Sequence, residues 1–235
     1  MIPLRDDQPV FSTPFVNYFL IALNVLIFLF ELSVGMQSRG DLNALMFQFG
    51  VVPVKEVGLL TGIPSFSPGA ALVPILTSMF LHASWGHVIG NMWFLWIFGD
   101  NVEDYLGHFK YLVFYLLSGV AASFTHILLN SNSTIPSVGA SGAIAGVLGA
   151  YFILYPRARV LTWFPLFFLF YLPAWLMLGY WFLFQFLSGA ATSIAETSQT
   201  TGGVAFWAHV GGFVAGIVFI KLFPERPRRY RYGAW

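Results

Sequence analysis

The sequence predicts an all-α membrane protein, a bundle of six transmembrane helices whose two termini both lie on the cytoplasmic side. Hydrophobic residues make up 57% of its 235 residues and charged residues only 9%, far below the quarter or so that is usual for a soluble domain. Apolar runs of about 20 residues, enough to cross about 30 Å of hydrocarbon, recur along almost the whole chain. Aromatic residues make up 19%, which suits a lipid-facing surface with interfacial aromatic belts. The chain therefore belongs in a lipid bilayer.

Residues 1–13 form a polar segment that lacks the short hydrophobic core and small-residue cleavage site of a signal peptide. We expect them to be a cytoplasmic segment ahead of a true membrane helix. Six apolar runs follow, and they make one domain over residues 14–223. The expected helices are Pro14–Val34, Ala71–Phe98, Tyr111–Asn130, Ser141–Tyr155, Leu161–Leu187 and Val204–Phe223.

The segments between these runs are short, with two exceptions. Gly35–Gly69 is too polar and too rich in Gly and Pro to span a membrane, and we expect it to lie on the interface. Ser188–Gly203 is rich in Ser, Thr and Gly, which is typical of a flexible loop, and we expect it to cover the site as a mobile lid. Residues 224–235 form a basic tail that is expected to be cytoplasmic.

The basic residues give the orientation, because Lys and Arg near helix ends are retained on the cytoplasmic side. With the N-terminus inside, nine of the 11 basic residues lie inside and two lie outside, and the opposite orientation reverses this split. The second, fourth and sixth helices are then expected to run from outside to inside. The outer pair is Arg39 and Lys55, and the inner residues are Arg5, Lys110, Arg157, Arg159, Lys221, Arg226, Arg228, Arg229 and Arg231.

Polar side chains inside a membrane are costly, so each one is a functional candidate. The third to sixth predicted spans contain no Asp or Glu, which excludes the usual carboxylate proton relay. Four histidines remain within the spans, and the orientation places all of them in the outer half of the bilayer. They are His82 and His87 in the second span, His126 in the third and His209 in the sixth.

Ser141 opens the fourth span between two glycines. At a helix N-terminus, the unpaired backbone N–H groups and the helix dipole favour negative charge, as an oxyanion beside an attacked carbonyl requires. The flanking Gly139 and Gly142 let a substrate backbone approach closely. A helix of 15 residues rises only about 22 Å, so Ser141 is expected below the outer surface, beside a water-filled cavity. A cap or packing role is the alternative for this serine.

His209 shares a helical face with Gly212 and Gly216 in the sixth span. Ser141 begins a similar stripe of small residues in the fourth span. Two such stripes pack closely in membranes and would bring Ser141 and His209 within hydrogen-bonding reach. The pair provides a nucleophile and a base, and the lack of a nearby carboxylate predicts a Ser-His dyad rather than a triad.

His87 and Asn91 in the second span are four residues apart and share a helical face. His82 and His87 are five residues apart, so on one helix they are expected to point about 140° away from each other, which disfavours a two-histidine zinc site. Neutral His87 and Asn91 can donate to an oxyanion together with the Ser141 N–H, or they can form a structural hydrogen bond between helices. We expect His82 either to shape the cavity or to hold the first loop in place.

Three separated motifs thus fall in order on the second, fourth and sixth spans. They are His82, His87 and Asn91 ahead of Gly99-Asp100-Asn101-Val102-Glu103, then Gly139-Ala140-Ser141-Gly142, then Ala208-His209 with Gly211, Gly212 and Gly216. Together they resemble the rhomboid proteases over nearly the whole chain. The resemblance implies a serine endopeptidase that cleaves single-span membrane proteins near the outer end of the transmembrane segment. It also implies a Ser141–His209 dyad and an oxyanion hole formed by His87, Asn91 and Ser141.

Two features depart from the family pattern. The first loop lacks the Trp-Arg pair that many members carry, and Ala145 stands where some members have an aromatic residue packed on the catalytic histidine.

Two other functions compete with proteolysis. An inactive rhomboid-like protein that binds or escorts membrane clients is expected to lack the nucleophile or the base. The other is a transporter or channel, and transporters are expected to show internal repeats, which the sequence does not show.

The expected partners are transmembrane protein substrates and the lipid bilayer, with no nucleic acid, no metal and no cofactor. Because the chain has no cysteine, it can form neither a disulfide nor a thiolate metal site. The compact domain favours a multi-pass protein of a bacterial cell membrane. The natural substrate and the oligomeric state do not follow from the sequence.

Overall fold

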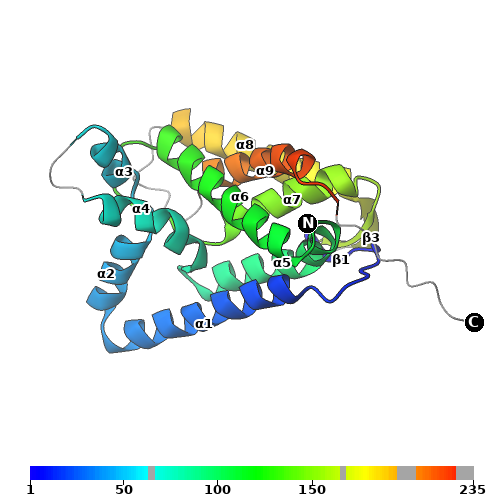
Figure 1. Ribbon diagram of the computed structural model, residues 1–235, viewed down its shortest axis with the longest axis horizontal. Helices are drawn as coiled ribbons and strands as arrows, with labels where there is room; N and C mark the ends of the chain where they lie inside the picture. The colour runs from blue at the N-terminus through cyan, green and yellow to red at the C-terminus, as the bar shows by residue number, and fades with distance from the viewer. Residues whose placement is uncertain (63–66, 165–167, 195–204, 226–235) are drawn as a thin grey trace, which may run out of the picture.

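The chain folds into a helical bundle with a small sheet at one end (Figure 1). The computed structural model describes residues 1–62, 67–164, 168–194 and 205–225. A three-stranded antiparallel sheet in the order β1-β2-β3 lies at the end of the bundle that holds the N-terminus, and α2, α3 and α4 lie at the other end. The elements are β1 (Ile2–Arg5), α1 (Phe15–Gln37), α2 (Arg39–Phe49), α3 (Pro53–Leu60), α4 (Pro68–Thr77), η1 (Ser78–Phe80), α5 (Trp85–Leu106), α6 (His108–Leu129), α7 (Ser141–Leu154), β2 (Arg159–Phe164), β3 (Phe168–Pro173), α8 (Ala174–Ile194) and α9 (Phe206–Leu222).

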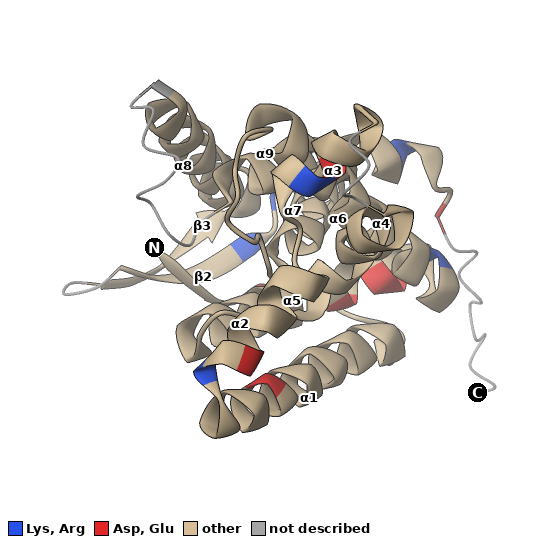
Figure 2. Cartoon of the chain, turned by 90° about the vertical axis from the view of Figure 1, so that its left-hand side faces the viewer, with Lys and Arg blue, Asp and Glu red and all other residues tan. Residues whose placement is uncertain are grey.

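The predicted spans correspond to helices of unequal length. By length and composition, α1, α6 and α8 can each cross a membrane, and the bent pair formed by α4–η1 and α5 gives a fourth crossing if it counts as one span. The other two, α7 and α9, are apolar but have only 14 and 17 residues. Six crossings with both termini on one side therefore stay a prediction. Figure 2 shows that charged residues are sparse along the described helices.

The second predicted span, Ala71–Phe98, is not one helix. The chain breaks between η1 and α5, and the two arms are bent by 74°. The Ser84 side chain caps α5 by accepting a hydrogen bond from the His87 N–H at 3.2 Å. The buried Glu31 carboxylate of α1 accepts the backbone N–H of His82, with its two oxygens 3.1 and 3.2 Å away. Side chains thus satisfy backbone groups that the break frees, which irregular backbone at membrane depth requires.

The prediction of a helix over the first part of Leu161–Leu187 is wrong, because α8 begins only at Ala174. The preceding residues form β2 and β3, which pair in register from Arg159 opposite Pro173 to Phe164 opposite Phe168, and β1 adds to the far side of β2. An apolar run alone does not distinguish a strand from a buried helix, and the aromatic and β-branched residues of β2 favour a strand.

Two predicted loops also gain helix. Gly35–Gly69, expected on the interface, contains α2 and α3. The first part of Ser188–Gly203, a segment that the sequence predicts to be a flexible loop, belongs to α8, which continues to Ile194. The rest of that segment, with the lid role predicted for it, lies outside the described residues, as do Val204 and the basic tail beyond Glu225.

Glycines let the backbones of α7 and α9 touch. A Cβ added to Gly212 would lie 2.0 Å from the carbonyl oxygen of Gly142, and one added to Gly216 would lie 2.0 Å from that of Gly146. A Cβ at Gly149 would lie 2.1 Å from the Phe213 carbonyl oxygen. Every residue of α7 from Gly142 to Tyr151 is buried, so this helix is the centre of the bundle.

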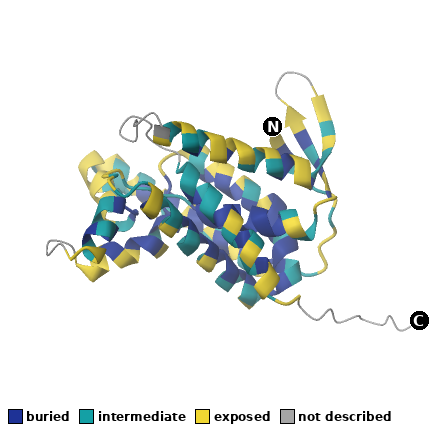
Figure 3. Cartoon of the chain, turned by 90° about the horizontal axis from the view of Figure 1, so that it is seen from above, coloured by how far each residue is buried: buried dark blue, intermediate teal, exposed yellow. Residues whose placement is uncertain are grey.

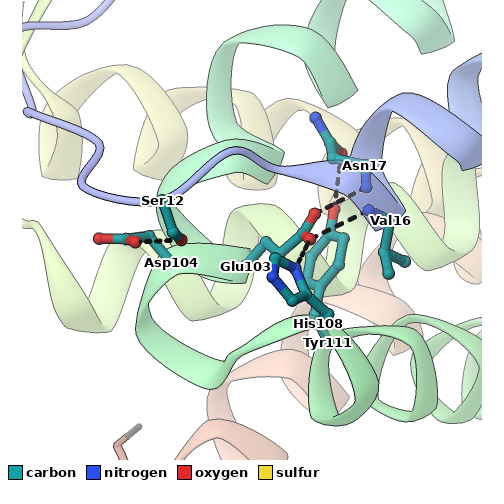
Figure 4. A network of polar contacts seen from close by, with 7 residues as sticks. All are labelled: Ser12, Val16, Asn17, Glu103, Asp104, His108 and Tyr111. Carbon is teal, nitrogen blue, oxygen red and sulfur yellow. Dashed lines mark hydrogen bonds and ion pairs between the residues drawn. The ribbon is translucent and has the colours of Figure 1, made fainter. Parts of the chain in front are cut away.

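A polar network at the sheet end ties α1 to α5 and α6 (Figure 4). The Glu103 carboxylate accepts the backbone N–H groups of Val16 at 3.0 Å and Asn17 at 2.7 Å, which lie in the first turn of α1, where the helix dipole favours a negative charge. The Asn17 side-chain oxygen accepts the Tyr111 hydroxyl at 2.8 Å, and the His108 ring lies 2.5 Å from Glu103. This network holds the start of α1 in place.

The contact between α7 and α9 predicts the effect of one methyl group. Gly216→Ala puts a carbon against the backbone of Gly146, so the helices must separate, and overpacking of this kind costs about 1–3 kcal/mol. We expect a lower unfolding midpoint in detergent. Gly69→Ala, whose new carbon meets open space, is the matched control and should unfold like the wild type. Equal midpoints for all three proteins would contradict the close contact.

Candidate active site

The first turns of α7 and α9 carry the predicted nucleophile and base. Ser141 is the first residue of α7, and its Oγ lies 2.7 Å from Nε2 of His209 on α9. Both side chains line a cavity of about 1140 Å³ that His87 and Asn91 of α5 also line. The four residues that the sequence predicted for one site are therefore brought to one cavity.

The other ring nitrogen of His209 contacts α8. Its Nδ1 lies 2.8 Å from Oε1 of Gln185, a side chain that is only 6% exposed. An amide oxygen can only accept, so with Oε1 facing the ring we expect Nδ1 to carry the proton and Nε2 to accept from the Ser141 hydroxyl. Trp181, one helical turn earlier, places its ring centroid 5.8 Å from that of His209. Trp181 thus gives His209 the aromatic neighbour that some family members place at the position of Ala145 in α7.

The backbone ahead of Ser141 takes a conformation that favours glycine. Gly139 has φ of 130°, and its N–H donates to the Ser78 carbonyl at 2.8 Å, which fixes the entry into α7. A Cβ at Gly139 would lie 2.6 Å from Nε2 of His87 and 3.6 Å from Nδ2 of Asn91. Glycine at this position therefore leaves room for both predicted oxyanion donors beside the start of α7.

His82 stands closer to these donors than the sequence predicted. The expectation that His82 and His87 point apart on one helix is wrong, because His82 precedes α5, and the two ring centroids lie 5.1 Å apart. The Asn91 amide donates to Nε2 of His82 at 3.0 Å and keeps its second hydrogen for another acceptor. The Glu31 carboxylate in turn holds the backbone of His82. His82 thus positions Asn91.

The remaining candidates have packing contacts. Gly142 lies against Ala122 of α6, where a Cβ would come within 2.6 Å, and Gly212 and Gly216 hold α9 on α7. His126 lines the same cavity, and its Nδ1 accepts the Asn130 side chain at 3.3 Å.

Sequence reasoning missed three residues around the site: Glu31, Trp181 and Gln185. Two of them carried a signal. Gln185 is the only amide side chain in the fifth predicted span, and Glu31 is the only acidic residue in the first. Polar groups at such depth are expensive and need a partner. Trp181 carried none, because it is one of many aromatic residues in an apolar helix.

Comparisons with known proteins agree on one family. The family model of the rhomboid domain matches residues 70–226. The yeast Saccharomyces cerevisiae protein named Rhomboid protein 1, mitochondrial, is 31% identical over 169 residues, which are 69% of this chain and 46% of that protein. The Mus musculus protein named Presenilin-associated rhomboid-like protein, mitochondrial, is 30% identical over 187 residues, 76% of this chain and 45% of the relative. Rhomboid-like protein 11, chloroplastic, of Arabidopsis thaliana is 29% identical over 187 residues and is matched over 60% of its length.

These relatives overturn the predicted location. They are named as mitochondrial or chloroplastic, so the expectation of a bacterial cell membrane is wrong. The size and composition of a membrane domain do not indicate which membrane it occupies, so they gave no basis for this prediction. The chain spans about half the length of the mitochondrial relatives.

The Ser141–His209 contact predicts a reactive serine. A fluorophosphonate probe labels hydroxyls that a neighbouring base activates, so we expect mass spectrometry to find the adduct on Ser141. Ser141→Ala and His209→Ala should each abolish labelling. Ser123→Ala changes another serine of the same cavity and should leave labelling intact. Labelling of His209→Ala at the wild-type rate would mean that the imidazole does not activate the serine.

Proposed function

The chain belongs to the rhomboid family, and from this premise we propose that it is an intramembrane serine endopeptidase of an organellar inner membrane. Its substrates are single-span membrane proteins. It cuts each substrate near one end of the transmembrane segment, on the side of the membrane opposite to the protease's own termini. The observation that carries the proposal is the 2.7 Å contact between Oγ of Ser141 and Nε2 of His209. Both termini face the side with most Lys and Arg, which in an organelle is the matrix or stroma.

The proposed reaction proceeds in two halves. His209 Nε2 takes the hydroxyl proton while Oγ of Ser141 attacks the scissile carbonyl, and the imidazolium then gives this proton to the leaving amine. The acyl group remains on Ser141 as an ester. Water attacks the ester with His209 again as base, which releases the carboxyl product and restores the hydroxyl.

Three donors border the place where the oxyanion forms. They are the Ser141 N–H at the start of α7, the second Asn91 amide hydrogen and the His87 ring. The hydrogen bond between Asn91 and His82 supports this role, because it fixes the amide before substrate arrives. Neutral donors suit a site in a membrane, where a fixed charge would be expensive to bury.

The length of α7 supports hydrolysis below the membrane surface. Its 14 residues rise about 21 Å, which is shorter than the roughly 30 Å hydrocarbon core. The cavity is lined by the polar segment Asn130–Ser133 as well as by the site, which allows it to hold the water that the second half-reaction consumes.

An inactive family member that binds or escorts membrane proteins is the competing proposal. Such a protein has no need for a paired nucleophile and base, whereas Ser141 and His209 are hydrogen-bonded here. A transmembrane reporter in proteoliposomes separates the two. We expect mass spectrometry to find two fragments with wild-type protein and none with Ser141→Ala. Binding without cleavage by wild type would favour the escort.

The proposed roles predict an order of effects on cleavage of this reporter. His209→Ala should reduce cleavage to background, and adding Ser141→Ala should make it no worse, because the two residues act as one unit. His87→Ala and Asn91→Ala each remove one oxyanion donor, which costs about 10² to 10³ in rate. His126→Ala is the matched control and should lose far less. Background activity for Asn91→Ala with normal thermal unfolding would contradict a shared oxyanion hole.

We also assign Gln185 as the positioning residue of the base, and it has its own test. Gln185→Leu keeps the packing but removes the acceptor for Nδ1–H, and the loss of one such bond costs about 0.5–1.5 kcal/mol, roughly 2- to 12-fold in rate. Gln185→Glu keeps an acceptor and should retain activity, with the acid limb of the kcat profile moved to higher pH because a carboxylate favours the imidazolium.

Gln48→Leu, at an exposed position of α2, controls for the loss of an amide and should behave as wild type. An unchanged pH profile for Gln185→Glu would reduce Gln185 to a packing residue.

A further inference from the structure

Large apolar side chains that the proposed chemistry does not use are exposed at the described end of the β2–β3 hairpin. We call this end, formed by Trp163, Phe164, Phe168 and Leu169, the tip. Figure 3 shows the hairpin projecting sideways from the bundle near the N-terminus, across the direction of the helices. Phe168 is 70% exposed and Leu169 is 61% exposed. Phe168 is opposite Phe164, and Leu169 is opposite Trp163, so the two exposed pairs lie on opposite faces of the sheet. The described end of the hairpin therefore presents apolar side chains on both faces, as membrane and protein interaction sites do.

The base of the sheet is fixed to the bundle. Val160 and Thr162 are fully buried, and the indole N–H of Trp93 on α5 donates to the Pro3 carbonyl of β1 at 2.6 Å. Trp93 lies seven residues before Asp100, the first charged residue of α5, which is about 10 Å of helix. Taking Asp100 as the level of the membrane surface, Trp93 lies about 10 Å below it, and the hydrogen bond to Pro3 holds the sheet near that level. Interfacial segments penetrate to roughly the same depth, 5–10 Å.

Two guanidinium groups lie behind the apolar tip. The Arg159 guanidinium sits 4.6 Å from the centroid of the Tyr171 ring, and Arg5 donates to the Tyr171 hydroxyl at 3.3 Å. The two carboxylates that follow Arg5 in the sequence have other partners: Asp7 accepts the backbone N–H of Arg159, and Asp6 accepts the Tyr151 hydroxyl. Within the part of the chain that the structure describes, neither guanidinium has a carboxylate within salt-bridge distance.

We propose that the sheet is an interfacial anchor that binds anionic lipids of the leaflet on the terminal side. Trp163, Phe164, Phe168 and Leu169 enter the boundary between headgroups and acyl chains, and Arg5 and Arg159 bind lipid phosphates. Open sheet edges are excluded from the hydrocarbon core, where their N–H and C=O groups would lack partners, so the interface is the depth that satisfies both backbone and side chains. This role is independent of the proposed protease activity.

Depth-dependent quenching tests the anchor, because the chain has no cysteine and accepts a single labelled one. The full chain carrying Leu169→Cys with an environment-sensitive fluorophore is placed in vesicles of dibrominated phosphatidylcholine, with or without phosphatidylglycerol. We expect bromine to quench this label more strongly, and aqueous iodide less strongly, than a label at Arg157→Cys, an exposed polar position just before β2. Trp163→Cys repeats the measurement should Leu169→Cys fail to fold.

Phosphatidylglycerol should increase the bromine quenching of the Leu169→Cys label. Adding Arg5→Gln and Arg159→Gln together should abolish this increase, whereas adding Arg39→Gln and Lys55→Gln, at the far end of the bundle, should preserve it. Iodide quenching as strong as that of free dye would place the sheet in water and overturn the proposal. Quenching that is the same with and without phosphatidylglycerol would overturn the lipid assignment. Self-quenching that rises with protein density would show that a second copy of the chain covers the tip.

Discussion

Backbone contact between α7 and α9 is the constraint on which the rest of the site depends. In lipid, helices gain no hydrophobic energy by associating, so close van der Waals packing must hold them together, and small residues provide it. Gly142 and Gly146 of α7 meet Gly212 and Gly216 of α9 with no space for a side chain. The contact runs up to the first turns of both helices. Ser141 and His209 then face each other at one depth, within hydrogen-bonding distance.

Around this contact, the other elements orient His209, the proposed base, without placing a charge beside it. Gln185 from α8 places its amide oxygen against Nδ1 of His209, and His82 from the break before α5 accepts from the Asn91 amide. The buried Glu31 carboxylate accepts the backbone N–H of His82 and so supports the proposed oxyanion donors rather than the proposed base. In the proposed mechanism, the Gln185 amide does for this imidazole what a carboxylate does in a triad, at lower desolvation cost in a membrane.

The sequence was sufficient for features that depend on spacing along a single helix. Small residues every three or four positions predicted the α7–α9 contact, and the same periodicity placed His87 and Asn91 on one face of α5. It was insufficient where distant segments decide the structure. The break before α5 depends on Glu31, which lies 51 residues from His82, and β2 depends on β1, whose residues lie more than 150 positions away. An apolar run by itself is the same for a strand and a buried helix, so the aromatic and β-branched residues of β2 gave only a weak local signal.

The tautomer of His209 tests the central claim most directly, namely that this packing holds the histidine as a base aimed at Ser141. Nitrogen NMR of histidine-labelled protein in lipid vesicles at neutral pH distinguishes a protonated from an unprotonated ring nitrogen. The account predicts a proton on Nδ1 of His209 and an unprotonated Nε2 whose resonance shifts in Ser141→Ala, as the hydroxyl donor is lost. A proton on Nε2 in the wild-type protein would contradict it, because that nitrogen could not then accept from Ser141.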